Sequence, residues 1–412
     1  MSEDINREKF FNLPEVRFAE IDAEKVINSI ITMYEGIMNT TLFPADPVRL
    51  FLSTLGAMIA QQNIISDFMN KQNLLRYATG NFLDHIAVDR NVYRLEPKKA
   101  TVYIRFTLNN ALNSHTTIPS GTRVTNGNIF FATNTEVQIP AGNLYGDTLA
   151  TCLSEGFIGN GFVAGQINKL VDVITNVTAK NITTSGGGSD LEDDDSFRNR
   201  IRLQPESFTT AGSELAYIFW ALSAHPNISD VSVTSPLPCH VNLWVMLKNG
   251  EIPEPDATTG LPAPEIIAIM ELFGINSDTS PQNTIANSLT GKRIRPLTDY
   301  IQVLPVKAVE IDYNIRWFIT SSQGHEYTQI KERIENAITE YETWQKAIAG
   351  RDINPDMLIK LCIGAGAKRV VVMAKIDNEL NYTPFRFIKL ERNQVAKFIN
   401  NNKLLDGIIE DE

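Results

Sequence analysis

Three consecutive glycines followed by a block of acids constrain the fold of this chain more than any other stretch. Glycine adopts almost any φ and ψ angles, so Gly186, Gly187 and Gly188 predict a hinge or a tight passage between two folded pieces. Ser189 and Asp190 are suitable N-cap residues, and acids in a first helical turn meet the positive end of the helix dipole. The pattern therefore predicts a well-capped connecting helix after the glycines.

Charged side chains on this expected helix have two interpretations. Asp194 and Arg198 stand four residues apart in the favourable acid-first order, which predicts an ion pair on one helix face. Arg198 and Arg202 are candidates for pairing with the acidic block or with a neighbouring subunit. The alternative is a divalent cation on the clustered carboxylates, but the block lacks the loop spacing and the glycine of a calcium-binding hand. We predict no metal site.

The composition is that of a folded protein without a nucleic-acid or membrane partner. With 412 residues, 43% hydrophobic and 21% charged, the chain is long enough for two to four domains. Its formal net charge of −11 would repel nucleic acid, and we find no basic patch. The most apolar helical stretch, Leu50 to Ile65, is interrupted by polar residues, so we expect no membrane span.

The cysteines and the N-terminus indicate the compartment. Cys152, Cys239 and Cys362 form no Cys-x-x-Cys pattern, so the sequence suggests neither a disulfide framework nor a zinc site. The first residues are polar and acidic, unlike a secretory signal. We expect a soluble protein made in a reducing cytoplasm.

Residues 1–96 predict an N-terminal helical domain. Asp46 and Pro47 combine an N-cap with a proline at the first helical position. Beyond them, residues recur with alternating steps of four and three, which predicts a helix-packing seam with one polar member, Gln62. The seam contains Phe51, Leu55, Met58, Gln62, Ile65 and Met69. We interpret it as an internal core in preference to a subunit interface, which is the alternative.

After Pro97 the hydrophobic period changes from that of helices to that of strands. Short alternating runs separated by turn residues predict a small β-rich domain over residues 97–185. Residues 186–300 predict a central α+β domain after the glycines, and residues 301–412 predict a C-terminal α+β domain with an acidic tail. The expected fold class is therefore α+β and multidomain, with two tandem α+β layers at its end.

The sequence contains no pattern that predicts an active site. Gly159-Asn-Gly161-Phe-Val-Ala164 formally fits a dinucleotide-binding pattern, but no helix clearly begins in this β-rich region. His325-Glu326 is not followed by the second histidine of a zinc-protease helix. The other histidines are dispersed, and no acidic pair lies in a recognisable glycosidase context. We expect no catalytic residue, no cofactor and no enzymatic activity.

Several segments, taken in chain order, resemble the baseplate J family. They are Asp46-Pro47, Tyr77-Ala78-x-Gly80-x-x-Leu83-Asp84, Ile118-Pro119-x-Gly121-Thr122, the Gly-Gly-x-Asp and Phe-Arg-x-Arg-Ile patterns between Gly187 and Ile201, and Gly350 to Pro355. Segments in one order are far more specific than any of them alone. The resemblance runs from about Asp46 to Ala374 and departs from the family at a long loop, residues 249–264, and at the acidic tail.

Members of this family are wedge subunits of the baseplate in contractile phage tails and related injection machines. The resemblance implies that two copies of the chain clasp one copy of a neighbouring tail protein. It implies that wedges form a ring around the central hub, next to the sheath-initiating protein, and transmit the trigger for sheath contraction. It also implies assembly in the bacterial host cytoplasm and then a place in the baseplate of the released particle.

A second class of function stays open, namely a tail-associated enzyme that processes cell-wall glycan or a receptor-binding tail protein. An enzyme would need a convergent set of carboxylates or a nucleophile, and a receptor-binding fibre would need long repeats or β-helix periodicity. The sequence shows neither of these. It leaves open whether the particle is a phage, a bacteriocin or an injection system.

Overall fold

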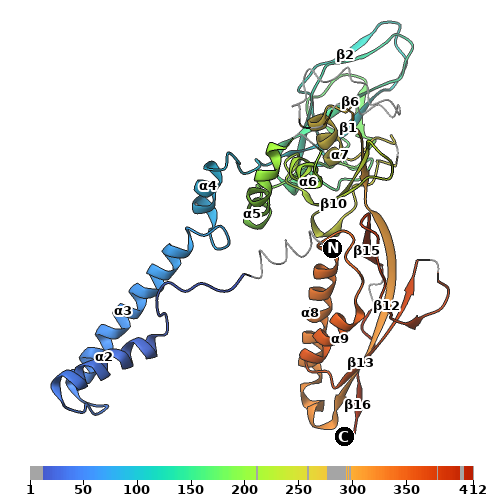
Figure 1. Ribbon diagram of the computed structural model, residues 1–412. Coiled ribbons are helices and arrows are strands. Elements are labelled where there is room, and N and C mark those ends of the chain that lie inside the picture. The colour runs from blue at the N-terminus through green and yellow to red at the C-terminus, as the bar shows by residue number, and fades with distance from the viewer. Residues whose placement is uncertain are drawn as a thin grey trace. The chain divides into compact units, whose positions relative to one another are not determined.

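The computed structural model describes residues 13–209, 212–257, 259–275, 294, 296, 298–377, 379–399 and 403–411. Helices and strands are mixed along the chain, which confirms the predicted α+β, multidomain class (Figure 1). The chain divides into two compact units. Unit 1 consists of residues 1–94 and 193–202, and unit 2 consists of residues 95–192 and 203–412.

Unit 1 is helical. The carboxylate of Asp22 accepts the backbone N–H groups of Glu24 and Lys25, and that of Asp46 accepts the N–H of Val48. An aspartate therefore caps each of the two longest helices of the unit, as the sequence predicts for Asp46. The helices are α2 (Ala23–Met38), α3 (Pro47–Lys71), α4 (Gly80–Val88) and α5 (Asp194–Leu203), whose last residue belongs to unit 2.

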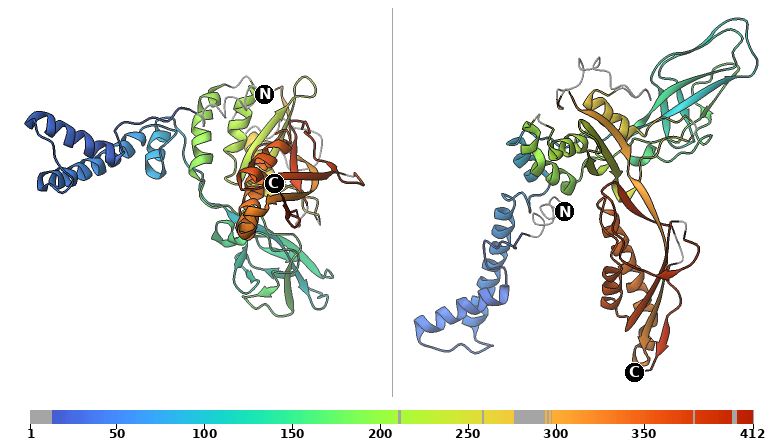
Figure 2. Two further views of the ribbon diagram at one scale, coloured as in Figure 1. Left: turned by 90° about the horizontal axis from the view of Figure 1, so that it is seen from below. Right: turned by 45° about the vertical axis from the view of Figure 1, so that its right-hand side comes forward.

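The two helices α2 and α3 pack against each other as a hairpin, which Figures 1 and 2 show from three sides. Ile31, Leu42 and Leu52 form its small core. Gly56 lets the helices approach closely, because a Cβ atom there would lie 2.8 Å from Cγ1 of Ile27. This packing uses one face of α3. Among the described residues, no helix is both long enough and apolar enough to cross a membrane.

The predicted seam lies on another face of α3, and the interpretation of the seam as an internal core is wrong. The buried residues of α3 are Leu52, Gly56, Ala60 and Asp67. The apolar seam residues are exposed, with fractions of 68% for Phe51, 41% for Leu55, 64% for Met58, 48% for Ile65 and 48% for Met69. Gln62 is exposed as well. The cause is that α2 covers only one side of α3, whereas the hydrophobic period shows just that a face is apolar.

The first part of unit 2 is a six-stranded sheet that closes almost into a barrel. Its strand order is β7-β3-β4-β6-β1-β8, and the two end strands also pack against each other. The alternation predicted after Pro97 places Val102, Ile104 and Phe106 inside the barrel. The elements are β1 (Lys99–Leu108), β3 (Arg123–Thr125), β4 (Phe130–Thr133), β6 (Tyr145–Glu155), η1 (Phe157–Gly159), β7 (Lys169–Leu170) and β8 (Val177–Asn181), with β2 (Thr116–Ile118) and β5 (Val137–Ile139) as a separate ribbon.

A three-stranded sheet with two helices follows the barrel in unit 2. Strand β10 runs antiparallel to β9 and parallel to β11. The hydroxyl of Ser213 caps α6 by accepting the N–H of Ala216. Because β11 pairs with β10, this sheet continues past the boundary expected at residue 300. The elements are η2 (Gln204–Phe208), α6 (Glu214–Leu222), β9 (Ile228–Thr234), β10 (His240–Leu247), η3 (Lys248–Gly250), α7 (Pro264–Phe273) and β11 (Tyr300–Pro305).

The last part of unit 2 is a sheet with α8 and α9 on one face (Figure 1). A long strand, β12, and a long helix, α8, form this part, and Tyr313, Trp317 and Tyr341 are fully buried between them. The central strand β12 pairs antiparallel with β13 and parallel with β15 and β16. The elements are β12 (Lys307–Thr320), η5 (Ser321–Glu326), α8 (Tyr327–Lys346), α9 (Pro355–Gly364), β13 (Arg369–Ile376), β14 (Thr383–Pro384), β15 (Gln394–Phe398) and β16 (Ile408–Glu410).

Candidate functional site

The three glycines lie inside unit 2, and the division between the units comes later, between Glu192 and Asp193. Gly186 is held in both directions, because its N–H donates to the carbonyl of Thr101 at 3.1 Å and its carbonyl accepts the N–H of Thr101 at 2.8 Å. The backbone of Gly186 is therefore part of the edge of the barrel. Of the two readings of this run, its packing fits a tight passage.

Gly187 and Gly188 are required by close packing. Gly187 has φ +78°, and a Cβ atom there would lie 2.6 Å from Cβ of Pro264. At Gly188 a Cβ atom would lie 2.5 Å from the carbonyl oxygen of Gly156. The N–H of Gly188 also donates to Oδ1 of Asn160 at 2.8 Å. A side chain at either glycine would collide with backbone or with a rigid proline ring.

A buried histidine forms a hydrogen bond with the backbone of the glycine run. His225 is 4% exposed, and its Nε2 lies 3.1 Å from the carbonyl oxygen of Gly187. Its Nδ1 accepts the N–H of Asn227 at 3.1 Å, so the proton is on Nε2, which donates to Gly187. The amide of Asn227 in turn donates to the buried carboxylate of Glu265 at 3.0 Å. Burial lowers the pKa of His225 below its ordinary value, although the Glu265 carboxylate acts in the opposite direction.

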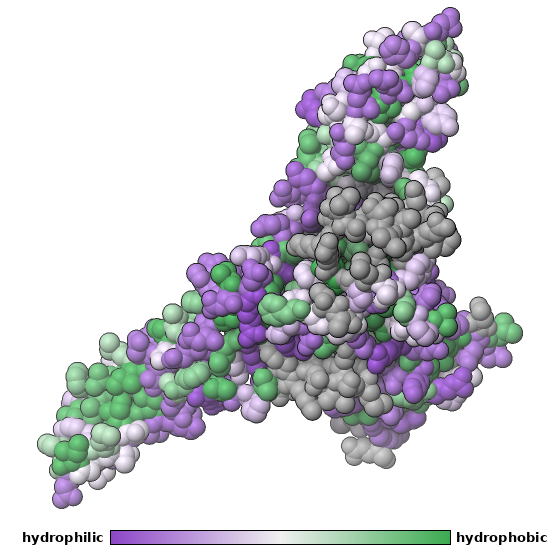
Figure 3. Space-filling view, turned by 45° about the horizontal axis from the view of Figure 1, so that its top comes forward, coloured by the Kyte–Doolittle hydropathy of each residue, from purple (hydrophilic) through white to green (hydrophobic). Residues whose placement is uncertain are grey.

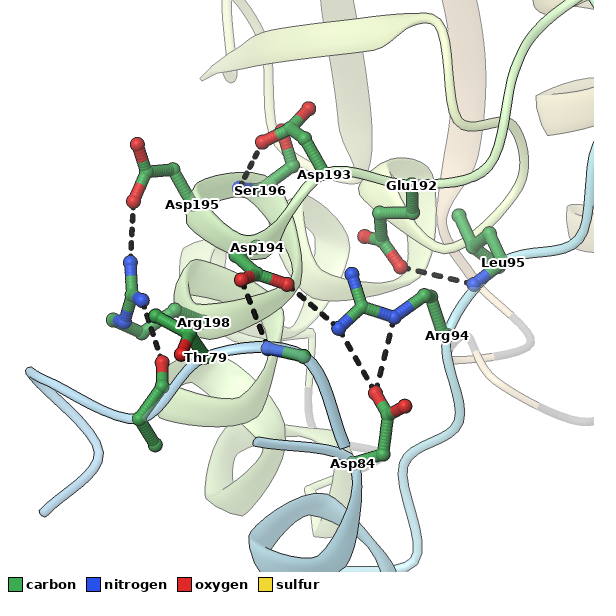
Figure 4. A network of polar contacts seen from close by, with 12 residues as sticks. Thr79, Asp84, Arg94, Leu95, Glu192, Asp193, Asp194, Asp195, Ser196 and Arg198 are labelled. Atoms are coloured by element: carbon green, nitrogen blue, oxygen red, sulfur yellow. Dashed lines mark hydrogen bonds and ion pairs between the residues drawn. The ribbon is translucent and has the colours of Figure 1, made fainter. Parts of the chain in front are cut away.

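The acids after the glycines have separate partners rather than a common one. Asp190 accepts the N–H of Phe157 at 3.1 Å, so it does not cap the following helix. Glu192 is buried and accepts the N–H of Leu95 at 3.0 Å, which ties two segments of unit 2 together (Figure 4). The prediction that Ser189 or Asp190 caps the helix is therefore wrong.

Asp193 caps α5 instead. Its carboxylate accepts the N–H of Ser196 at 2.9 Å and the hydroxyl of the same residue at 3.0 Å. This is the geometry of an N-cap aspartate. The chemistry of the prediction was right, but the helix begins four residues later than Asp190 because the intervening chain is bound to the barrel.

The side chain of Asp194 binds a different arginine from the one predicted. Nη2 of Arg94 donates to its Oδ1 at 2.8 Å, and the N–H of Gly80 donates to its Oδ2 at 3.0 Å (Figure 4). Arg94 also binds Asp84, at 3.0 Å from Nε. Burial acts to raise the pKa of Asp194, but the hydrogen bonds from Gly80 and Arg94 outweigh it and hold the pKa below its ordinary value.

Arg198 is a buried clamp within unit 1. It is 6% exposed, its Nε donates to the carbonyl of Leu75 at 2.8 Å, and its Nη2 donates to the carbonyl of Ala78 at 2.9 Å. Its ion pair is with Asp195, so the predicted partner Asp194 is wrong. The guanidinium thereby satisfies two carbonyl groups of the chain between α3 and α4, in a fork geometry that lysine lacks.

Two further arginines of α5 also act inside unit 1. Nη2 of Arg200, which is 4% exposed, donates to the carbonyl of Tyr93 at 2.7 Å. Nη2 of Arg202 donates to the side-chain oxygen of Asn199 at 3.2 Å. Sequence reasoning missed Arg94 and Arg200, because their partners are remote in the chain and no local spacing connects them. Arg94 and Arg200 thus connect α5 to the chain that follows α4.

The acidic block does not form a common site. Each carboxylate that we describe between residues 190 and 195 points to its own hydrogen-bond donor. Among the described residues, no three His, Cys, Asp or Glu side chains gather in an arrangement that would hold a metal ion. The stretch positions backbone and helices, and it brings no reactive groups together.

The helical hairpin carries an exposed apolar surface. In Figure 3, apolar residues gather over the hairpin at the lower left of the view. Besides the seam of α3, the exposed apolar side chains are Met33, Ile37, Met38, Phe43, Leu50, Ile59, Ile64 and Phe68, each at least 41% exposed. Exposed apolar area on this scale is typical of a protein–protein contact surface. Of the predicted site residues, only Gln62 lies on it.

Known proteins resemble this chain in sequence. Residues 103–188 match the family model of the Baseplate J-like protein barrel domain, and residues 209–305 match that of the Baseplate J-like central domain. Baseplate protein J of Escherichia phage P2 is 27% identical over 198 residues, which are 48% of this chain and 57% of the relative. The chain thus spans a little over half the length of this curated relative.

A solved structure, the six-fold symmetrised cryo-EM structure of the anti-feeding prophage baseplate, contains a similar chain with a TM-score of 0.40 and 11% identity, over 91% of this chain and 90% of that one. The barrel match includes the glycine passage, and the central match covers the three-stranded sheet with its helices. The two domain matches follow each other in the order of the family segments seen in the sequence. The two domain matches and the relative from phage P2 support the resemblance of this chain to the baseplate J family.

Proposed function

We propose that this chain is a structural wedge subunit of the baseplate of a contractile tail. The observation that carries the proposal is the exposed apolar face of the α2–α3 hairpin on a chain that resembles the baseplate J family. Burying a large apolar side chain contributes roughly 1.5–3 kcal/mol, so a face with this many exposed side chains favours permanent association. In a subunit of a permanent assembly, such an apolar face would be buried against a partner.

The partners in this proposal are a second copy of the chain and a neighbouring tail protein. Wedges would close into a ring around the central hub, beside the sheath-initiating protein. The ring would assemble in the bacterial host cytoplasm and then form part of the released virion or tail-like particle. Its role would be mechanical, since the interfaces hold the ring closed and then rearrange so that sheath contraction can start.

In this proposal the glycine run is a fixed passage and the subunit interfaces are the moving parts. Gly186, Gly187 and Gly188 are hydrogen-bonded or closely packed within unit 2. A large change of φ and ψ at these residues would break that packing. We therefore place the rearrangement at interfaces between subunits, where packing can exchange between two arrangements.

Native mass spectrometry of the full chain tests the proposal, alone and co-expressed with the tail protein encoded beside it. We expect a defined complex that contains two copies of this chain and one copy of the neighbour. A monomer that binds neither itself nor the neighbour would contradict the wedge role. Hydrolysis of cell-wall glycan by the purified chain would instead support the alternative of a tail-associated enzyme.

A further inference from the structure

Residues 403–411, which we call the strap, close the edge of β12 that β15 leaves open. Strand β15 pairs only with the first part of β12. Further along, the N–H of Ile315 donates to the carbonyl of Lys403 at 2.7 Å, and the N–H of Leu405 donates to the carbonyl of Ile315 at 2.9 Å. Strand β16, which is part of the strap, then runs parallel to Phe318–Thr320. The strap therefore takes the place of an edge strand.

A glycine of the strap lies directly against the buried indole ring of Trp317. A Cβ atom at Gly407 would lie 2.5 Å from Cζ2 of this ring. Nε1 of Trp317 donates to the carbonyl of Leu405 at 2.9 Å, and the N–H of Gly407 donates to the hydroxyl of Tyr327 at 2.9 Å. Only a segment with glycine at this position can pass over the ring. The edge therefore selects its strand by shape as well as by backbone pairing.

Polar contacts fix the far end of the strap. Arg369 at the start of β13 forms an ion pair with Glu410, and its Nε donates to that carboxylate at 3.2 Å. Nζ of Lys368 donates to the carbonyl of Asp411 at 3.1 Å, and the hydroxyl of Ser321 donates to Oδ1 of Asp411 at 2.9 Å. Ion pairs at the surface contribute little to stability. These contacts therefore set the register of the strap on β12 without binding it tightly.

The strap covers buried residues of β12 without being buried itself. The structure describes the whole strap, and none of its residues is buried; Leu405, Ile408 and Ile409 are 36%, 41% and 54% exposed. The residues of β12 beside it include Ile315 and Trp317, which are both 0% exposed. A segment that buries so little of its own surface opens at a lower free energy than the core strands. Its release leaves unpaired backbone groups on β12, and such an edge readily pairs with another strand.

We propose that the edge of β12 from Ile315 to Thr320 is a strand-binding site, which the strap occupies in cis and can leave while the rest of the sheet stays folded. The docked strap keeps strands of other chains from this edge, so it acts as an autoinhibitory contact. The segment that fits the site runs parallel to β12, with a glycine against Trp317 and a carboxylate three residues later for Arg369. The inference goes beyond the proposed function and does not depend on it.

A fluorescently labelled peptide with the sequence of residues 403–411 tests the site in the full-length chain. The Gly407→Leu variant cannot dock its own strap, because the new side chain would collide with Trp317. We expect the peptide to bind this variant roughly tenfold or more tightly than the wild-type chain, since the wild-type strap competes at a high effective concentration. Fluorescence anisotropy measures both affinities. A peptide that itself carries Gly407→Leu should bind neither chain.

The matched control is Gly364→Leu at the end of α9, where a Cβ atom would meet nothing within 4 Å. We expect this variant to bind the peptide as weakly as the wild type. Equal binding of the peptide to Gly407→Leu and to the wild type, or binding to neither, would refute the strand-binding site. If Gly407→Leu instead removed the protection of the β13 amides against hydrogen exchange, the strap would be part of the folding core, and the proposal would fall as well.

The release of the strap is measured in the wild-type chain by native-state hydrogen exchange. The N–H groups of Ile315, Leu405 and Gly407 are bonded between the strap and the rest of the sheet with its helices. We expect these three amides to exchange together, through one opening, roughly tenfold or more faster than the amides of β13 that pair with β12. Protection equal to that of β13 would contradict a strap that opens independently.

Discussion

At the scale of single residues, α5 is held in unit 1 by arginine side chains that donate hydrogen bonds to backbone carbonyl groups. Arg198 reaches two carbonyl groups, of Leu75 and Ala78, and Ala78 is fully buried. A buried carbonyl that loses its donor costs about 1–3 kcal/mol, so the side chain matters more for these groups than for its ion pair with exposed Asp195.

Replacing this clamp should therefore destabilise unit 1. We expect Arg198→Ala to lower the free energy of local unfolding around α4 by about 2–4 kcal/mol, measured by native-state hydrogen exchange. Arg198→Lys should recover only part, because an ammonium group cannot reproduce the fork. The control is Arg90→Ala, at an exposed arginine of the same unit, for which a change within about 0.5 kcal/mol is expected. Equal effects of the two alanine variants would contradict the clamp.

The buried His225 gives unit 2 a dependence on pH. Its pKa is lowered in the folded protein, so the native state prefers the neutral ring and binds fewer protons than the unfolded state. The contribution of His225 is therefore complete above its unfolded pKa, near 6.5, and is lost as the pH falls below it. Protonation also removes the acceptor at Nδ1 that binds the N–H of Asn227.

We expect the unfolding free energy of unit 2 to fall between pH 7 and pH 5 by up to about 1.4 kcal/mol per pH unit from this group. Denaturant titrations at several pH values measure the slope, and His225→Gln should flatten it. Asp194, whose pKa is also lowered, loses its contribution only as the pH falls below the ordinary aspartate range, so it does not interfere in this window. An unchanged slope in His225→Gln would assign the pH dependence to other groups.

At the scale of elements, the glycine run and the α2–α3 hairpin both contain a glycine that allows close packing. Gly56 and Gly187 both stand where a Cβ atom would come within 2.8 Å of a neighbour. At Gly187 the neighbour is the Pro264 ring at the start of α7, which cannot rotate away, and φ is positive as well. Close packing of the barrel edge against α7 depends on this residue.

Gly187→Ala is expected to destabilise unit 2 by about 2–4 kcal/mol, from the positive φ angle and from the collision with Pro264. Gly165→Ala separates the two causes, because Gly165 also has a positive φ, of +88°, but a Cβ atom there meets nothing within 4 Å. The control should cost about 1 kcal/mol. Thermal unfolding measures both variants. A similar loss of stability in both variants would show that contact with Pro264 does not restrict Gly187. The interpretation of the three glycines as a hinge would then be favoured again.

At the scale of the whole molecule, our proposal assigns the stability of the chain and its assembly to different faces of α3. Leu52 is packed inside the hairpin, whereas Met58 is 64% exposed on the seam. Because Met58 is mostly exposed, a polar substitution there removes little packing from the single chain. It does place a charge where, in our proposal, an apolar interface forms.

Met58→Asp should thus leave unfolding of the single chain unchanged within about 0.5 kcal/mol and weaken complex formation at least tenfold, about 1.4 kcal/mol or more. Leu52→Asp is the contrasting variant, because it should unfold the hairpin. Thermal unfolding of the isolated chain and native mass spectrometry of the co-expressed complex measure the two effects. Normal assembly of Met58→Asp would exclude the seam from the interface.

Local chemistry determined much of the fold. The N-cap at Asp46 acts on the N–H group of Val48, two residues away, so the local sequence contains both partners. The alternation in β1 and in β12 likewise fixes which side chains turn inward once one face is covered. The family segments, the helical beginning and the α+β class were readable for this reason.

Only the tertiary structure decided which groups meet across long separations. The sequence suggested the pair of Asp194 with Arg198 from their spacing, but the fold brings Arg94, 100 residues away, to that carboxylate. The sequence likewise showed that the seam of α3 is apolar, but it did not show whether α2 or another molecule covers this face. A hydrophobic period indicates that one face of a helix is apolar, whereas the tertiary fold determines what packs against that face.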